Sequence, residues 1–108
     1  MQQLGVGGQA SARVGVDAPD AETVVLRLEG ELDVSNVDAL EQIVTPRLEG
    51  GVRRVIVDAG QLAFADSSAI AMWLRWAAAG PSVEVRNPSP VMRRVLDGLG
   101  LTEVLSVA

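Results

Sequence analysis

Four side-chain types that carry much of protein chemistry are missing from this chain of 108 residues, which contains no cysteine, histidine, lysine or tyrosine. The absence of cysteine excludes disulfides, thiolate metal sites and cysteine nucleophiles. Without histidine and lysine, the chain alone cannot build a Ser-His-Asp triad, a histidine metal site or a P-loop. Acid and base chemistry would depend on carboxylates. We therefore predict that the protein is not an enzyme and uses no cofactor or metal.

The charged residues narrow the possible partners. The net charge is −5, and the nine cations are all arginines that form no basic block. Because a nucleic-acid surface needs concentrated positive charge, we expect no direct nucleic-acid binding and a better match to a basic protein partner. No apolar run approaches the roughly 18 to 20 residues of a membrane span, and residues 1–11 lack the basic and apolar regions of a signal peptide. We therefore expect no membrane insertion and a cytoplasmic location.

The chain divides into a short tail and one domain. Residues 1–11 are rich in glutamine and glycine and show no apolar period, so they are predicted to be a flexible N-terminus. Residues 12–108 are predicted to form a single domain, because a chain of this length with 48% hydrophobic residues supports one modest core.

Strand and helix patterns alternate along this domain. Two strands separated by the turn residues 17–20 predict an antiparallel hairpin, and each later strand is followed by a helical pattern. Such alternation is typical of parallel crossovers, so the predicted fold is α/β: a mixed β-sheet with helices packed mainly on one face, in the order β-β-α-β-α-β-α. Residues 101–108 are apolar enough to dock as a helical turn or a short strand. The predicted strands are residues 12–16, 23–29, 52–58 and 82–86, and the predicted helices begin near residues 37, 67 and 90.

Three local patterns give specific expectations. Pro46 lies within the first helical pattern, where it either ends the helix near Val44 or kinks it. Residues 60–61 are predicted to form a loop, after which residues 62–64 return to the core. In the last helix Ser89 is the predicted N-cap. The buried face of that helix is predicted to hold Val91, Val95, Leu96 and Leu99.

The most informative stretch is residues 64–70 (FADSSAI), which joins a strand pattern to a helical one. Asp66, Ser67 and Ser68 are all residue types that cap helix N-termini. A hydroxyl at this position lies where free backbone N–H groups and the helix dipole favour negative charge, so a phosphate could be added or removed there. The residues alone leave a second interpretation open, in which Ser67 only caps the helix.

Several short motifs occur together: residues 28–33 (LEGELD), 55–58 (VIVD), 64–69 (FADSSA), 87–90 (NPSP) and 99–101 (LGL). In this order and spacing, from about residue 12 to residue 107, they resemble the sulfate-transporter and anti-sigma factor antagonist (STAS) domain. The similarity is greatest to the free-standing bacterial anti-sigma factor antagonists.

The resemblance implies a partner switch. In this family the unphosphorylated antagonist binds an anti-sigma factor that is also a serine/threonine kinase, and so releases a sigma factor for transcription. The kinase phosphorylates a serine at the start of the helix, and a phosphatase reverses the reaction. The family acceptor is the first serine of an Asp-Ser-Ser-Gly motif, which corresponds to Ser67. A phosphate adds about 1.5 to 2 negative charges, and Asp33 and Asp66 would add to the repulsion in an interface.

The resemblance also suggests where the partner binds: the Ser67 helix start, the loop at residue 33 and the neighbouring helix face. Ala69 stands where the family usually has glycine, which places a methyl group where a kinase loop or partner backbone would approach. Met72 and Trp76 form either a partly exposed patch suited to a partner or the margin of a wider buried face. The predicted partner-binding residues are Asp33, Asp66, Ser68, Ala69, Met72 and Trp76.

Two other functions remain compatible with the sequence. Some members of the family lack a phosphoswitch and act as small cytoplasmic subunits of phospholipid-transport ABC systems, and the Ser-Ser-Ala helix start is tolerable in such a subunit. A carboxylate-dependent hydrolase would need two converging acids, for which Asp33, Asp58 and Asp66 are the obvious candidates.

Overall fold

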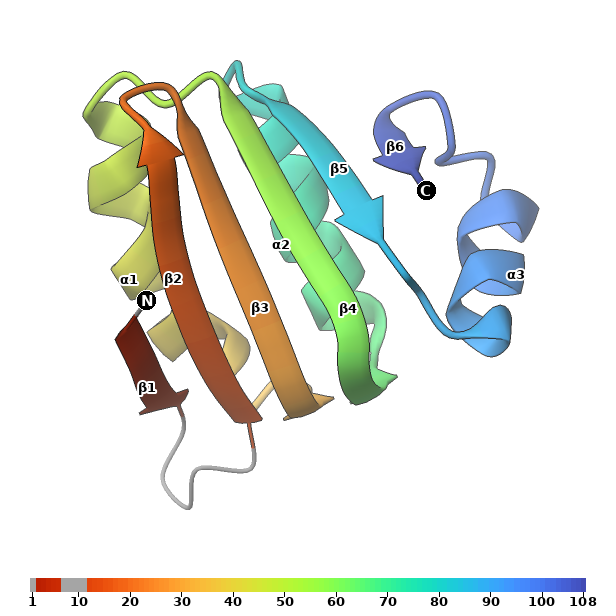
Figure 1. Ribbon diagram of the computed structural model, residues 1–108. Helices are drawn as coiled ribbons and strands as arrows, with labels where there is room; N and C mark the ends of the chain where they lie inside the picture. Colours follow the sequence, from red (N-terminus) through yellow and green to blue (C-terminus); the bar gives the residue numbers. More distant parts are fainter. Residues whose placement is uncertain (1, 7–11) are drawn as a thin grey trace.

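The protein is a mixed sheet with helices on one side, as seen in a computed structural model that describes residues 2–6 and 12–108 (Figure 1). The six strands lie in the sheet in the order in which they follow along the chain. The strands are β1 (Gln2–Val6), β2 (Ala12–Asp20), β3 (Thr23–Leu32), β4 (Arg54–Ala65), β5 (Ser82–Arg86) and β6 (Leu105–Val107), and the helices are α1 (Val37–Glu49), α2 (Ser67–Ala78) and α3 (Pro90–Gly98).

The strand pairing confirms the predicted α/β fold. Strands β2 and β3 form the expected antiparallel hairpin, whereas β3, β4, β5 and β6 pair in parallel. Each parallel pair is connected through a helix, because parallel strands need a long crossover. At the hairpin turn the backbone N–H of Glu22 donates to the Asp20 carboxylate at 2.8 Å. Because β3 and β4 run in the same direction, both strands end at the same edge of the sheet.

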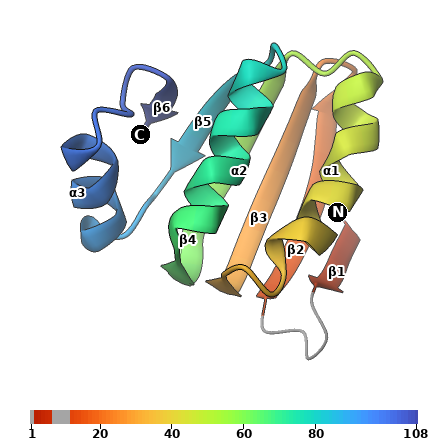
Figure 2. The same ribbon diagram turned by 180° about the vertical axis from the view of Figure 1, so that it is seen from behind.

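Helices α1 and α2 cover one face of the sheet, as predicted (Figure 2). Between them and the strands lies a core that includes Leu26, Leu40, Val57 and Trp73, all with 0% exposure. The two helices are also joined at their surface by a bidentate ion pair between Arg75 and Glu41, with N···O distances of 3.0 and 2.8 Å. None of the helices in the described residues is long and apolar enough to cross a membrane.

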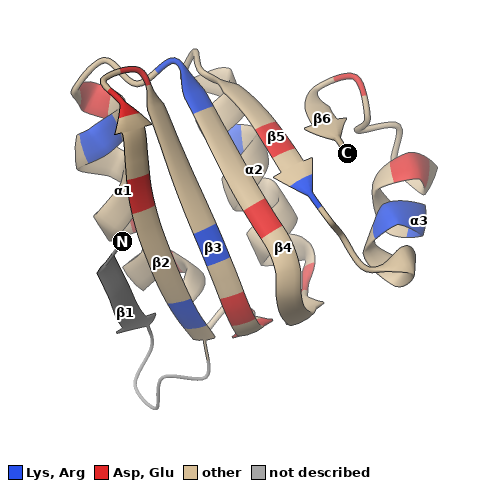
Figure 3. Cartoon of the chain, viewed as in Figure 1, with Lys and Arg blue, Asp and Glu red and all other residues tan. Residues whose placement is uncertain are grey.

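The other face of the sheet is open and carries charges of both signs (Figure 3). Arg27 on β3 lies beside Asp58 on β4, with Nε and Oδ2 3.6 Å apart. On β5, Arg86 Nε donates to Glu84 Oε2 at 2.6 Å. These charged side chains keep the uncovered face solvated, so the sheet needs no second helical layer.

Helix α3 lies beside the β5–β6 edge of the sheet instead of over its face (Figures 1 and 2). Ser89 caps it as predicted, since its hydroxyl accepts from the Met92 N–H at 3.1 Å. The predicted buried face is wrong for three of its four residues: Leu96 is buried, but Val91, Val95 and Leu99 are 62%, 42% and 61% exposed. A helix at the edge of a sheet is covered on a narrower stripe than a helix on its face.

Both ends of the chain extend the sheet beyond the predicted elements. The N-terminus predicted as flexible contains β1, which pairs antiparallel with β2, so the prediction is corrected for Gln2–Val6. Backbone hydrogen bonding to the outer edge of β2 can form this strand without an apolar period in its sequence. Met1 and residues 7–11 lie outside the described residues. At the other end, both predicted alternatives occur: the backbone N–H groups of Val104 and Leu105 donate to the Leu101 carbonyl in a turn, and Leu105–Val107 then forms β6.

Helix α1 and strand β4 each continue past a point where the sequence patterns allowed them to end. Helix α1 continues through Pro46 to Glu49, so the helix does not end near Val44. Strand β4 likewise continues through residues 60–61, where a loop was expected. Its pairing with β3 accommodates the extra residues by register shifts, as β-bulges do.

Candidate functional site

Two loops meet at the edge where β3 and β4 end. Leu32 and Ala65 are paired in the parallel ladder, so the chain leaves both strands at the same level. The backbone N–H of Asp66 then donates to the carbonyl oxygen of Leu32 at 3.1 Å. This bond places the loop that begins at Asp33 beside the start of α2, and it brings together two parts of the site that are far apart in the sequence.

Asp66 is the N-cap of α2. Its backbone is extended, and its Oδ1 accepts from the backbone N–H groups of Ser68 at 2.9 Å and Ala69 at 3.4 Å. The Ser68 hydroxyl also donates to Asp66 Oδ1. Asp66 therefore satisfies two N–H groups that the helix itself leaves free, which is the function of an N-cap.

Ser67 and Ser68 differ in the availability of their hydroxyl groups. The Ser67 side chain is exposed, and its hydroxyl forms no hydrogen bond with any residue that the structure describes. The Ser68 side chain is half-buried, and its hydroxyl is bound to Asp66. Of the two serines, Ser67 is the one whose oxygen is accessible to another protein.

The loop after β3 is fixed by its own polar side chains. Asp33 Oδ1 accepts from the backbone N–H of Ser35 at 2.9 Å and also from the Ser35 hydroxyl. The backbone N–H of Asp33 donates to Asn36 Oδ1 at 3.0 Å, and Asn36 Nδ2 donates to the Glu31 carbonyl at 2.8 Å. Because Asn36 is fully buried, it holds this loop to the end of β3. Val34, 77% exposed, is presented between the two anchored positions.

The charge at the site is negative. The hydrogen bond from the Ser68 hydroxyl lowers the pKa of Asp66 below its usual value, and backbone N–H groups of Ser68, Ala69 and Val34 lower it further. The carboxylate is therefore ionised at neutral pH. Within the part of the chain that the structure describes, no three acidic side chains converge in a way that could hold a metal ion.

The structure corrects the predicted helix face. Ala69, Met72 and Trp76 are 0%, 0% and 2% exposed, so none of them can present a side chain to a partner. They are buried because α2 packs against the sheet and against α1 together, which requires a wider apolar face than one helix stripe. The wider buried face was one of the two alternatives for Met72 and Trp76. Burial of Ala69 also directs its methyl group inward.

Sequence patterns missed one surface residue near the site. Phe64 was expected in the core but is 53% exposed. The register explains this, because Gly30 pairs with Leu62 and the next residue, Glu31, pairs with Phe64, so Ala63 is an extra residue in β4. One extra residue turns the following side chain to the opposite face of the strand.

The chain is similar to known proteins in both sequence and fold. A family model described as "Mlab, STAS domain" matches residues 14–106. The chain is 37% identical over 86 residues to an anti-sigma F factor antagonist of Lysinibacillus sphaericus, which covers 74% of this chain and 73% of that relative.

Solved structures of anti-sigma factor antagonists are also similar to this chain. The anti-sigma factor antagonist SpoIIAA in its unphosphorylated form has a TM-score of 0.73 and 33% identity, over 88% of this chain and 87% of that one. The phosphorylated form of SpoIIAA, described as a Bacillus cell fate determinant, has a TM-score of 0.69 and 33% identity, over 88% and 90% of the two chains. The fold is also shared with an antagonist from Mycobacterium paratuberculosis, with a TM-score of 0.75 and 22% identity, over 90% and 85%. This protein belongs to the STAS-domain family of anti-sigma factor antagonists, which are regulators and not enzymes.

Proposed function

We propose that this protein binds an anti-sigma factor that is also a serine/threonine kinase, and that phosphorylation of Ser67 ends the binding. The observation that carries the proposal is the exposed Ser67 hydroxyl, which forms no hydrogen bond within the described residues, beside a Ser68 hydroxyl that is bound to Asp66. Support also comes from the similar SpoIIAA structures, which are of an unphosphorylated and a phosphorylated form.

The unphosphorylated surface suits a protein interface. Ser67 and Val34 are exposed, and the half-buried side chains of Asp33, Asp66 and Ser68 fix the two loops that present them. Preorganised loops lose little conformational freedom on binding, which favours affinity. The partner-binding surface that we propose therefore contains Asp33, Asp66, Ser67 and Ser68, without Ala69, Met72 or Trp76.

Phosphorylation would change this surface by charge. The Ser67 hydroxyl oxygen attacks the γ-phosphorus of ATP, ADP leaves, and a base of the kinase accepts the hydroxyl proton. The new group carries about 1.5 to 2 negative charges at pH 7. Asp66 already occupies the N–H groups of Ser68 and Ala69, so these donors are not free to neutralise the phosphate. The phosphate thus adds to the negative charge of Asp66, and burying both in an interface is unfavourable. A phosphatase would restore the binding form.

A kinase assay tests the proposal directly. The protein is incubated with the anti-sigma kinase of the same genome and ATP, and the products are mapped by mass spectrometry. We expect one phosphate, on Ser67, which Ser67→Ala abolishes and Ser68→Ala retains. Binding of the kinase to Ser67→Asp is expected to be at least tenfold weaker than to Ser67→Ala. Unchanged affinity of Ser67→Asp would refute the switch, and stable co-purification with a permease and an ATPase would instead support a transport subunit.

A further inference from the structure

An apolar groove lies next to the proposed phosphorylation site. It has a volume of about 380 Å³ and runs between the end of β4 and helix α3. Its walls include Phe64 and Ala65 from β4, Ile70 from α2, and Val91, Met92 and Val95 from α3. The groove is therefore formed by three elements that converge at the same edge of the sheet as Ser67.

Three of the apolar side chains that line this groove are exposed. Phe64, Val91 and Val95 are 53%, 62% and 42% exposed. Leu99, the C-cap of α3, is 61% exposed and follows Val91 and Val95 at intervals of four residues, although it does not line the groove. Single exposed apolar side chains are ordinary, but a contiguous set that lines a groove is typical of a binding surface.

The position of the groove indicates its occupant. Phe64 and Ala65 directly precede Asp66 and Ser67 in the chain, and Ile70 is in the first turn of α2. A protein that covers Ser67 would therefore lie within a few residues of the groove lining on both sides of Ser67. We infer that the groove binds an apolar segment of the anti-sigma factor; this inference rests on the proposed function.

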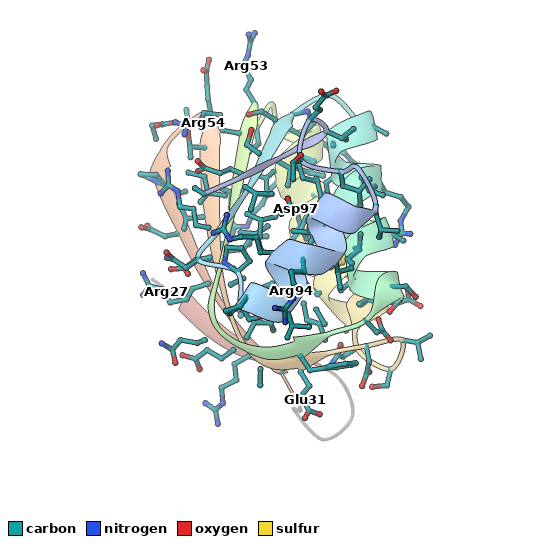
Figure 4. The ribbon with its side chains drawn as sticks, turned by 90° about the vertical axis from the view of Figure 1, so that its right-hand side faces the viewer. Arg27, Glu31, Arg53, Arg54, Arg94 and Asp97 are labelled. Carbon is teal, nitrogen blue, oxygen red and sulfur yellow. The ribbon has the colours of Figure 1, made fainter. Side chains whose placement is uncertain are left out.

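An arginine beside the groove indicates that the partner segment also carries a negative charge. Arg94 is exposed on α3 (Figure 4), and it forms no ion pair with any of the described residues. Three residues along a helix correspond to a rotation of about 300°, so Arg94 lies about 60° around the helix from Val91. The segment thus combines apolar side chains, which fill the groove, with a carboxylate that faces Arg94.

The closeness of Ser67 to the groove explains how one phosphate on Ser67 would weaken binding over the groove as well. Phosphorylated Ser67 would place a charged group at the edge of an apolar groove that must lose its water when the partner binds. The cost of removing water from that group opposes closure over the whole groove.

Two groove variants and one control test the inference. Val91→Asp puts a charge into the groove, yet it lies in the first turn of α3, where a carboxylate suits the helix dipole. Phe64→Ala removes exposed apolar area without adding charge. Val104→Asp is the control, because Val104 is 54% exposed and does not line the groove. The Kd for the purified anti-sigma kinase is measured by calorimetry with each unphosphorylated protein, after thermal melts show that each is folded.

We expect Val91→Asp and Phe64→Ala each to raise the Kd at least about tenfold, with the control within about twofold of the wild type. Arg94→Glu should raise it several-fold at low salt and less at high salt. If both groove variants bind like the wild type while Ser67→Asp does not, the groove inference is overturned and the proposed function stands. If Ser67→Asp also binds like the wild type, the proposed function fails. A wild-type dimer in light scattering that both groove variants dissociate would show that a second copy is the occupant, which also overturns the inference.

Discussion

The backbone N–H of Asp66 donates to the carbonyl oxygen of Leu32 at 3.1 Å, and this bond connects two loops that are separated by a whole helix and strand in the chain. It is possible because β3 and β4 are parallel neighbours and end at the same level. The proposed interface is therefore built on the rigid end of a sheet and not on one free loop. A rigid surface cannot easily rearrange around an added group, so a single phosphate is enough to disturb it.

The cap of α2 should be measurable in the stability of the protein. Asp66→Ala removes the oxygen that binds the N–H groups of Ser68 and Ala69, and we expect it to lower the free energy of unfolding by about 1 kcal/mol. Asp66→Asn is the matched control, because asparagine is an equally good N-cap residue and should lose a few tenths of a kcal/mol at most. Urea denaturation at pH 7 measures both; equal losses for the two variants would contradict the capping role.

The charge of Asp66 predicts a dependence of stability on pH. The pKa of Asp66 in the folded protein is lowered, first by the Ser68 hydroxyl and then by backbone N–H groups. A lowered pKa stabilises the fold at pH values above the unfolded pKa of about 3.9, and this contribution is lost as the pH falls through the lower folded value. Urea unfolding of the wild type and Asp66→Asn from pH 7 to pH 2 should therefore show the difference between them shrinking below about pH 4. A difference that grows with acid would mean that the pKa is raised.

Met72 should behave as a core residue and not as a binding residue. It is 0% exposed, so Met72→Ala leaves a cavity and is expected to cost about 2 to 5 kcal/mol of unfolding free energy. Phe64→Ala, at a position 53% exposed, should cost much less. Chemical denaturation of both variants makes the comparison. If Met72→Ala is as stable as the wild type but binds the partner more weakly, Met72 is a binding residue and not a core residue.

Pro46 predicts a stabilising substitution. It lies within α1, where proline removes a backbone donor and is about 3 kcal/mol less favourable than alanine in an interior position. We expect Pro46→Ala to raise the unfolding free energy by roughly 1 to 2 kcal/mol, since greater freedom of the unfolded chain offsets part of the gain. The control is Ala39→Pro in the first turn of the same helix, where a missing N–H is tolerated better. A lower melting temperature for Pro46→Ala would show that Pro46 fits its site without cost.

Some of this site could be predicted from the sequence because the signals are local. Asp66 before two serines indicates a capped helix start, and Ser89 before Pro90 indicates another; both are observed. The apolar periods of the strands likewise predicted the hairpin and the parallel crossovers. The caps depend on residues within one helical turn, and the order of strands and helices follows from the period of each segment, so local side-chain patterns predict both.

Other features depend on which elements meet, and these the tertiary structure decided. The extra residue Ala63 turns Phe64 outward only because of how β4 pairs with β3. Packing of α2 against both the sheet and the neighbouring helix α1 buries Met72 and Trp76, and the edge position of α3 leaves Val91 exposed. The sequence by itself thus determined that α2 begins at a serine directly after its N-cap residue. Whether the neighbouring side chains are buried or available to a partner was decided by packing between distant segments, which local patterns do not encode.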